Sequence, residues 1–298
     1  MNPAERKFSM LCTLCPRNCN IDRSAQTGYC SMPEEAVIAR AALHFGEEPI
    51  IGGELGSGAI FFSGCSLKCV YCQNFELSRG KIGKKTSPQR LAEIFRELED
   101  QGAKNIDLVN PTHFQGAIMR ALEIYRPKVP VVWNSSGYEK WENIRLMEGL
   151  VDIYLPDMKY MTGAVSGLYS GAPDYFAHAS KALREMARQT GPTVIGEDGL
   201  MKKGMIVRHL VLPGQIEETK KVLVWIRRAL PDAWLSLMAQ YTPFGDAFKY
   251  PPLDRMLTEK EYEAAVDIAS SLGFENGFFQ ETDSSGVTEI PLFDLTGV

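Results

Sequence analysis

Three cysteines stand close together in the sequence, at Cys65, Cys69 and Cys72. A loop can bring three thiols at this Cys-x3-Cys-x2-Cys spacing to one point only by wrapping around a common centre, which indicates a metal cluster. A closed structural zinc site needs four protein ligands, whereas a [4Fe-4S] cluster held by three thiolates keeps one iron open for a cofactor or substrate. The spacing therefore favours an open, reactive iron-sulfur site. The alternatives are a zinc knuckle and three buried core cysteines.

The other four cysteines precede this loop, at Cys12, Cys15, Cys19 and Cys30. Proline and glycine between them supply turns, so four thiols can close a tetrahedral site. Zinc and a second, four-cysteine [4Fe-4S] cluster both fit this description. The alternative is a set of reduced, shielded thiols in a loop-rich extension. Three ligands plus four account for all seven cysteines of the chain.

The segments that must position these loops alternate between apolar strands and amphipathic helices. An apolar run at 59–63 leads directly into the loop of Cys65, and Ser87 and Pro88 begin a helix that Gly102 ends. Further strands are expected at 105–109, 129–133, 151–155, 205–212 and 234–241, with helices at 114–125, 141–147, 174–189, 216–229 and from the capping box at Thr258 to Gly273. Six such units of near-continuous apolar strands predict a parallel sheet covered by helices.

Polar residues follow most of these strands. They are Asn110 and Thr112, then Asn134, Ser135 and Ser136, then Asp157 and Lys159, then Arg208 and His209 within the fifth strand, and Gln240 and Gln280 after late strands. The carboxyl ends of parallel strands meet at one edge of a sheet, where α/β barrels place their active sites. Each set also has a structural alternative: serines cap helices, Asp157 and Lys159 form an ion pair, and a lone histidine is more often a core residue.

The motif Cys-x3-Cys-x-aromatic-Cys, here Cys65, Cys69, Tyr71 and Cys72, resembles the signature of the radical S-adenosylmethionine (SAM) enzymes. The resemblance implies a [4Fe-4S] cluster whose open iron binds the amino and carboxylate groups of SAM. It implies reductive cleavage of SAM to methionine and a 5′-deoxyadenosyl radical, which abstracts a hydrogen from the substrate. It places Tyr71 near the adenine and makes the polar residues at the strand ends, from Asn110 to His209, the candidates for SAM binding.

The resemblance also implies the architecture. We expect an α/β fold, a partial (β/α)6 TIM-like barrel over residues 51–298, with a small cysteine-rich metal-binding extension over residues 1–50. No catalytic acid or base is assigned.

Two further segments resemble one branch of these enzymes. Asp157-Met158-Lys159 resembles the Asp-x-Lys motif of glycyl radical enzyme activases, and the stretch from Val207 to Pro213 resembles their fifth strand. The chain is thus similar to uncharacterised relatives of the pyruvate formate-lyase activating enzyme. The implied activity is an oxidoreductase that abstracts hydrogen from a protein or peptide, with a glycyl radical enzyme as one such substrate. The implied partners are this substrate and an electron donor such as flavodoxin or ferredoxin.

Two other functions remain open at this point. The chain could modify a small molecule or nucleoside by radical chemistry, which needs a deep closed pocket where a peptide needs an open groove. It could also be a non-catalytic iron-sulfur scaffold or electron-transfer protein, because two metal motifs in one chain permit that.

Charge and hydropathy narrow the possible partners and the cellular location of the protein. The 298 residues carry a formal net charge of −5 and no long basic run, which disfavours nucleic acid as a partner. No stretch of about 18 apolar residues suits a membrane span, and no leader-like apolar region follows Met1. We therefore expect a cytoplasmic protein, with its cysteines reduced or bound to metal.

Overall fold

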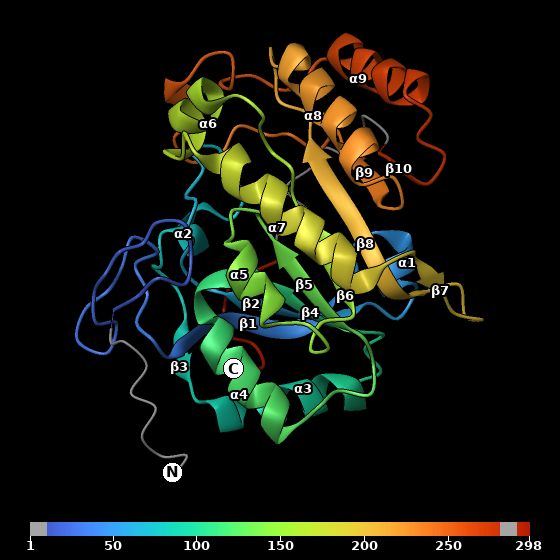
Figure 1. Cartoon of the computed structure of the whole chain (residues 1–298). Coiled ribbons are helices and arrows are strands. Elements are labelled where there is room, and N and C mark those ends of the chain that lie inside the picture. The colour runs from blue at the N-terminus through green and yellow to red at the C-terminus, as the bar shows by residue number, and fades with distance from the viewer. Residues whose placement is uncertain (1–10, 281–290) are drawn as a thin grey trace.

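A mixed β-sheet forms the centre of the molecule (Figure 1). The structure, a computed structural model, describes residues 11–280 and 291–298. The strands follow the order β10-β9-β8-β6-β5-β4-β2-β1-β3, with β7 paired to β8. Their bounds are β1 Ala36–His44, β2 Ser57–Phe62, β3 Lys84–Thr86, β4 Ile106–Val109, β5 Val131–Ser135, β6 Ile153–Pro156, β7 Val194–Ile195, β8 Met201–Leu210, β9 Trp234–Met238 and β10 Gly277–Phe279.

The strands from β2 through β4, β5, β6, β8 and β9 to β10 all run parallel to their neighbours. β1 is antiparallel to β2 on one side and to β3 on the other. Every residue of β2, β5 and β6 is buried, as expected for parallel strands covered by other elements. The carboxyl ends of the parallel strands therefore gather at one edge of the curved sheet.

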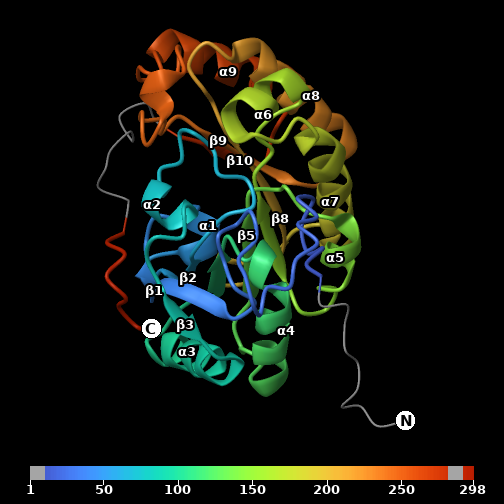
Figure 2. The same ribbon diagram turned by 90° about the vertical axis from the view of Figure 1, so that its left-hand side faces the viewer.

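The described helices are α1 Pro49–Gly52, α2 Phe75–Ser78, α3 Pro88–Asp100, α4 Gln115–Ile124, α5 Trp141–Arg145, α6 Gly163–Ser170, α7 Tyr175–Thr190, α8 Ile216–Ala229 and α9 Glu259–Ser271. Those from α3 to α9 form an arc around the outer face of this sheet (Figure 2). Alternate strand residues, such as Trp133, Tyr154 and Val207, pack into the large core cluster that contains the apolar helix residues. The other face of the strands is left to line the interior of the curve.

The helix ends follow from local chemistry. The hydroxyl of Ser87 accepts a hydrogen bond from the N–H of Arg90, with Pro88 at the first position of α3. Thr258 and Glu261 form a reciprocal capping box at the start of α9. The predicted α/β class and partial barrel are confirmed. The division of the chain at residue 50 stays a prediction, and β1, which lies before it, pairs with the barrel strand β2.

The segment 291–298 lies beside β1. The N–H of Ala41 donates to the carbonyl of Thr296, and the N–H of Leu295 donates to the carbonyl of Ala39. Phe293 packs edge-on against Phe61 of β2. This segment therefore covers part of the sheet edge at β1. In the described part of the chain, no helix combines the length and apolarity needed to cross a membrane.

Candidate functional site

A cavity of about 480 Å³ lies inside the curve of the sheet, within the size range of small-molecule sites. All three thiols of the Cys65 loop line it. They face polar residues from the neighbouring strand ends, which are Asn110, Asn134, Ser135, Ser136, Asp157, Lys159, Arg208, Gln240 and Gln280. The sequence-predicted set of strand-end residues thus largely converges on one chamber, at the edge where the parallel strands end.

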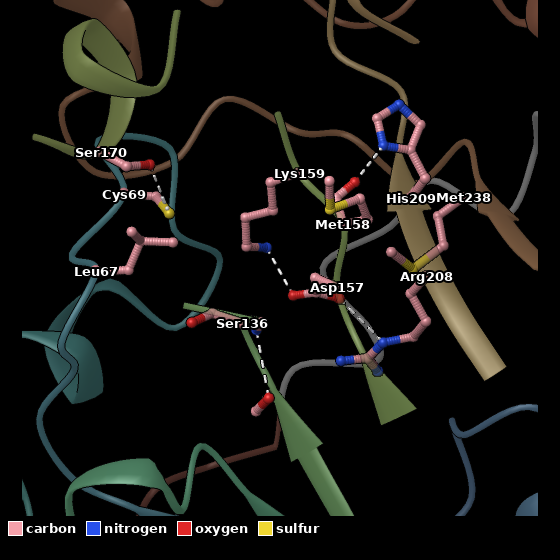
Figure 3. Close-up of polar contacts among 12 residues, drawn as sticks. Leu67, Cys69, Ser136, Asp157, Met158, Lys159, Ser170, Arg208, His209 and Met238 are labelled. Atoms are coloured by element: carbon pink, nitrogen blue, oxygen red, sulfur yellow. Dashed lines mark hydrogen bonds and ion pairs between the residues drawn. The ribbon is translucent and has the colours of Figure 1, made fainter. Parts of the chain in front are cut away.

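The backbone of the cysteine loop is folded to leave donors for the thiols. Gly64 has a φ of +78°, and a Cβ there would lie 2.4 Å from the carbonyl oxygen of Cys30, so only glycine fits. The sulfur of Cys65 accepts hydrogen bonds from the N–H groups of Leu67 at 3.3 Å and Lys68 at 3.5 Å. Ser170 donates its hydroxyl to the sulfur of Cys69 at 3.1 Å (Figure 3). The Ser170 hydroxyl acts to lower the pKa of Cys69, because its hydrogen bond favours the thiolate.

Burial acts in the opposite direction on two of the thiols. It raises the pKa of Cys72 to about 12 and also raises the pKa of Cys69, because a buried anion loses hydration. An isolated thiolate would be costly here, whereas a bound metal deprotonates a coordinating thiol. Within 11–280 and 291–298, no three Cys, His, Asp or Glu side chains are close enough for a single ion. Three thiols on one chamber suit an iron-sulfur cluster, which holds its ligands farther apart than one ion does.

Asp157, Lys159 and Arg208 form the electrostatic centre of the chamber (Figure 3). The Lys159 ammonium lies 2.7 Å from one Asp157 oxygen, and Arg208 Nε donates to the other at 3.1 Å. Burial alone would raise the pKa of Asp157, but the two cations outweigh it and hold the pKa below its usual value. Burial would lower the pKa of Lys159, yet Asp157 raises it. All three groups are therefore charged at neutral pH, and the predicted ion pair of Asp157 with Lys159 is present.

The other predicted SAM-binding residues divide into two groups. Tyr71 lines the cavity and its hydroxyl shares a hydrogen bond of 2.6 Å with that of Tyr160. Asn110 lines it too, and donates its amide to the carbonyl of Gly64. Asn134 accepts from Arg208 at 2.6 Å, and Ser135 accepts from the N–H of Gly137. These four residues can therefore reach a ligand in the chamber.

Thr112 and His209 are not brought to the cavity, so the structure does not support a SAM-binding role for them. Thr112 begins a 3-10 turn and donates its hydroxyl to the buried Glu139 at 2.9 Å. His209 follows Arg208 in β8 and so points to the opposite face of the strand. There its ring contacts the Met158 carbonyl at 2.7 Å and the Thr219 hydroxyl at 3.0 Å. Burial lowers the pKa of His209 to about 4, so its ring is neutral.

Several residues of the chamber were not expected from the sequence. Glu47 and Glu48 line it from the segment after β1, and Asp107 of β4 is fully buried behind Glu47. A charged residue inside an apolar strand is the signal that could have revealed Asp107. No local sequence signal marks the two glutamates, because their position depends on the pairing of β1 with β2.

The loop of Cys12, Cys15, Cys19 and Cys30 packs directly on the loop of Cys65, Cys69 and Cys72. Backbone hydrogen bonds join Cys12 to Ile21 and Asn20 within this loop. Burial raises the pKa of Cys15 to about 12, and the three other cysteines of the set add to the shift. The four thiols are thus neighbours, although they are not arranged around a single ion. A second metal at this loop, zinc or cluster, stays a prediction.

Arg17 connects the two loops. Its Nε donates to the carbonyl of Ser66 at 2.7 Å, and its terminal nitrogens donate to the carbonyls of Gly171 at 2.6 Å, Ser170 at 3.0 Å and Leu67 at 3.4 Å. The guanidinium also lies over the ring of Tyr29, 3.9 Å from its centre. A single side chain therefore ties the N-terminal loop to the Cys65 loop and to the end of α6.

We expect Arg17→Ala to lower the free energy of unfolding by about 2–3 kcal/mol, because it leaves backbone carbonyl groups without the charged donor that now binds them. Iron retained after reconstitution should fall as the Cys65 loop loosens. Arg17→Lys should recover only part of the loss, since an ammonium lacks the planar fork. Urea unfolding and iron analysis measure both effects. Arg120→Ala, at an exposed position of α4, is the control and should change stability by less than about 0.5 kcal/mol; equal effects of the two alanine variants would contradict the bridging role.

Comparisons with known proteins agree with this geometry. A family described as "4Fe-4S single cluster domain" matches residues 52–160, which contain Cys65, Cys69 and Cys72. A protein of Methanocaldococcus jannaschii, described as "Uncharacterized protein MJ0674", is 30% identical over 276 residues, covering 89% of this chain and 75% of the archaeal protein. The chain belongs to the family of this archaeal protein.

Solved structures share the fold of this MJ0674 family member at low identity. Streptococcus suis SuiB bound to precursor peptide SuiA is 12% identical with a TM-score of 0.50, over 73% of this chain and 46% of SuiB. The structure titled "Native anSMEcpe with bound AdoMet" is 14% identical with a TM-score of 0.48, over 72% of this chain and 59% of that one. The chain spans about half the length of these proteins. SuiB therefore shares the fold of this chain, and the cluster-domain family matches the segment that holds Cys65, Cys69 and Cys72.

Proposed function

We propose that this protein is a radical SAM enzyme that abstracts hydrogen from a protein or peptide. The observation that carries the proposal is the convergence of Cys65, Cys69 and Cys72 on the same chamber as Asp157 and Lys159. Cys65, Cys69 and Cys72 would hold a [4Fe-4S] cluster, which would supply the electron for reductive cleavage of SAM to methionine and 5′-deoxyadenosine, the latter carrying the hydrogen taken from the substrate. A flavodoxin or ferredoxin is the proposed source of the electron.

The chain's own residues would bind and orient SAM. Asn134, Ser135 and Ser136 offer amide and hydroxyl groups from the end of β5, and the Ser136 hydroxyl is buried without a hydrogen-bond partner. An unpartnered buried hydroxyl costs free energy that a polar ligand would recover. Asp157 and Lys159 present one acceptor and one donor group beside the thiols, which suits a ligand that carries both charges.

Two observations favour a peptide substrate. SuiB, which shares the fold, was solved with a bound precursor peptide, and the Asp157-Met158-Lys159 motif resembles that of glycyl radical enzyme activases. A backbone glycine of a glycyl radical enzyme is therefore the specific substrate that we propose. The Cys12, Cys15, Cys19 and Cys30 loop would carry zinc or a second cluster and brace the catalytic loop through Arg17.

Anaerobic reconstitution tests this function. The protein would be loaded with iron and sulfide, analysed for iron, sulfide and zinc, and incubated with SAM and dithionite. We expect 5′-deoxyadenosine and methionine in equal amounts. About four irons with one zinc per chain would identify a single cluster, and about eight irons a second one. An intact cluster that yields no 5′-deoxyadenosine with any reductant would contradict the proposal and favour a scaffold or electron-transfer role.

A further inference from the structure

The chamber has a floor opposite the cysteine loop, formed by Glu47 and Glu48. β1 is antiparallel to β2, and its last residue, His44, pairs with Ser57, the first residue of β2. The segment after β1 therefore lies at the amino ends of the parallel strands, whereas the cysteine loop follows their carboxyl ends. Both glutamates line the cavity. The cavity thus extends from the thiols at one end to carboxyl groups at the other.

One carboxyl oxygen at this floor is buried without a hydrogen-bond partner, Oε2 of Glu48. Asp107, fully buried in β4, accepts from the Asn134 amide through Oδ2 at 3.2 Å and shares a hydrogen bond with the adjacent Glu47. An oxygen such as that of Glu48 is rare in folded proteins, because it loses its hydration without gaining a hydrogen bond. Its presence on a residue that lines the cavity indicates that a donor group completes the site.

Positive charge is scarce around these carboxyls. Arg208 lies 3.7 Å from Glu47, but its Nε already binds Asp157 and one terminal nitrogen binds Asn134. Lys159 is engaged by Asp157. One shared guanidinium therefore faces three carboxyl groups at the floor. In agreement, burial and the adjacent Glu47 raise the pKa of Asp107 well above its usual range, and burial raises that of Glu48.

We propose that the floor formed by Glu47 and Glu48, with Asp107 buried behind Glu47, binds a cationic group of the substrate, an ammonium or guanidinium such as a lysine or arginine side chain. The proposal rests on the function above and adds to it the chemistry of the substrate. Cys69, Lys159, Asp157, Arg208 and Glu47 follow one another along the cavity, so SAM at the thiol end leaves the carboxyl end free. A basic side chain reaching the floor would hold the peptide's reacting carbon between the two ends.

Calorimetric titration of the cluster-loaded protein tests this site without turnover. S-Adenosylhomocysteine would fill the SAM site, and the probes would be acetyl-Gly-Lys-Gly-amide, its arginine analogue and the same peptide with Nε-acetyl-lysine. We expect at least one basic peptide to bind about tenfold or more tightly than the acetylated one. Glu48→Gln should remove this difference, and Asp107→Asn provides a second, independent variant. Glu54→Gln, an exposed position after α1, is the control and should bind as wild type.

The outcomes separate this site from the enzymatic function. Equal binding of basic and acetylated peptides by wild type would overturn the site even if SAM cleavage is normal. A loss of S-adenosylhomocysteine affinity in Glu48→Gln, with no effect on peptide discrimination, would also overturn it, because the floor would then serve SAM. Discrimination that is lost in both variants supports the site, and it does so even if the wild type fails to cleave SAM.

Discussion

Replacing Cys69 with alanine should abolish 5′-deoxyadenosine formation, and Cys65→Ala and Cys72→Ala should do the same. Each thiol is one of only three from this loop that line the chamber, so no side chain of the loop can replace it. Loss of one thiolate leaves an iron without a protein ligand, and the cluster should be lost or converted on exposure to chelator. The expected loss of activity is at least about 10⁴-fold, set by the slow uncatalysed cleavage of SAM. Product is measured by chromatography after anaerobic incubation with dithionite.

Two further variants serve as comparisons for the Cys65, Cys69 and Cys72 substitutions. Glu76 lies in the same segment, is exposed and forms an ion pair with Lys81 at the surface. The Glu76→Ala variant should therefore retain full activity. Cys19→Ala tests the N-terminal loop and should lower activity less than the Cys65 set, since Cys19 lies outside the chamber. A Cys69→Ala protein that forms product at the wild-type rate would exclude the cluster assignment.

The sequence predicted the site best where chemistry and spacing coincide. The cysteine spacing and the apolar strands sufficed to place Asn134, Ser135, Asp157 and Lys159 on one chamber, because parallel strands end at one edge. His209 lies outside the chamber for a reason visible in the sequence: Arg208 and His209 are neighbours in a strand, so only one can face inside. Glu47 and Glu48 could not be found, because their position depends on the long-range pairing of β1 with β2.

The N-terminal loop shows a second limit of local reasoning. Its cysteines predict a separate metal-binding extension, but the loop's position relative to the barrel depends on contacts that are distant in sequence. Arg17 reaches carbonyls of residues 66 and 170, and Lys68 donates to the hydroxyl of Ser31. No spacing rule links these positions. The packing of the two cysteine loops against each other therefore gives the extension a bracing role beyond any metal that it binds.

Asp157→Asn should destabilise the fold strongly as well as disturb the chamber. The carboxylate now balances two buried cations, Lys159 at 2.7 Å and Arg208 at 3.1 Å. An amide can accept from one of them but turns its N–H₂ toward the other. Leaving a buried charge unpaired typically costs about 3–5 kcal/mol, and we expect a loss of this order in urea unfolding at pH 7. Asp198→Asn, which breaks the exposed pair with Lys202, should cost at most about 1 kcal/mol.

The pH dependence of the unfolding free energy identifies the cause of the stability loss in Asp157→Asn. The pKa of Asp157 is lowered in the folded protein, so its stabilisation is present above its unfolded pKa of about 3.9 and disappears as pH falls through the folded value. The pKa of Lys159 is raised, so its share is complete below about pH 10 and is lost only above that. The difference between wild type and Asp157→Asn should therefore be greatest between these limits and shrink on acidification below about pH 4. A difference that stays constant on acidification would instead point to lost packing, and the paired carboxylate would no longer explain the conformation of the chamber.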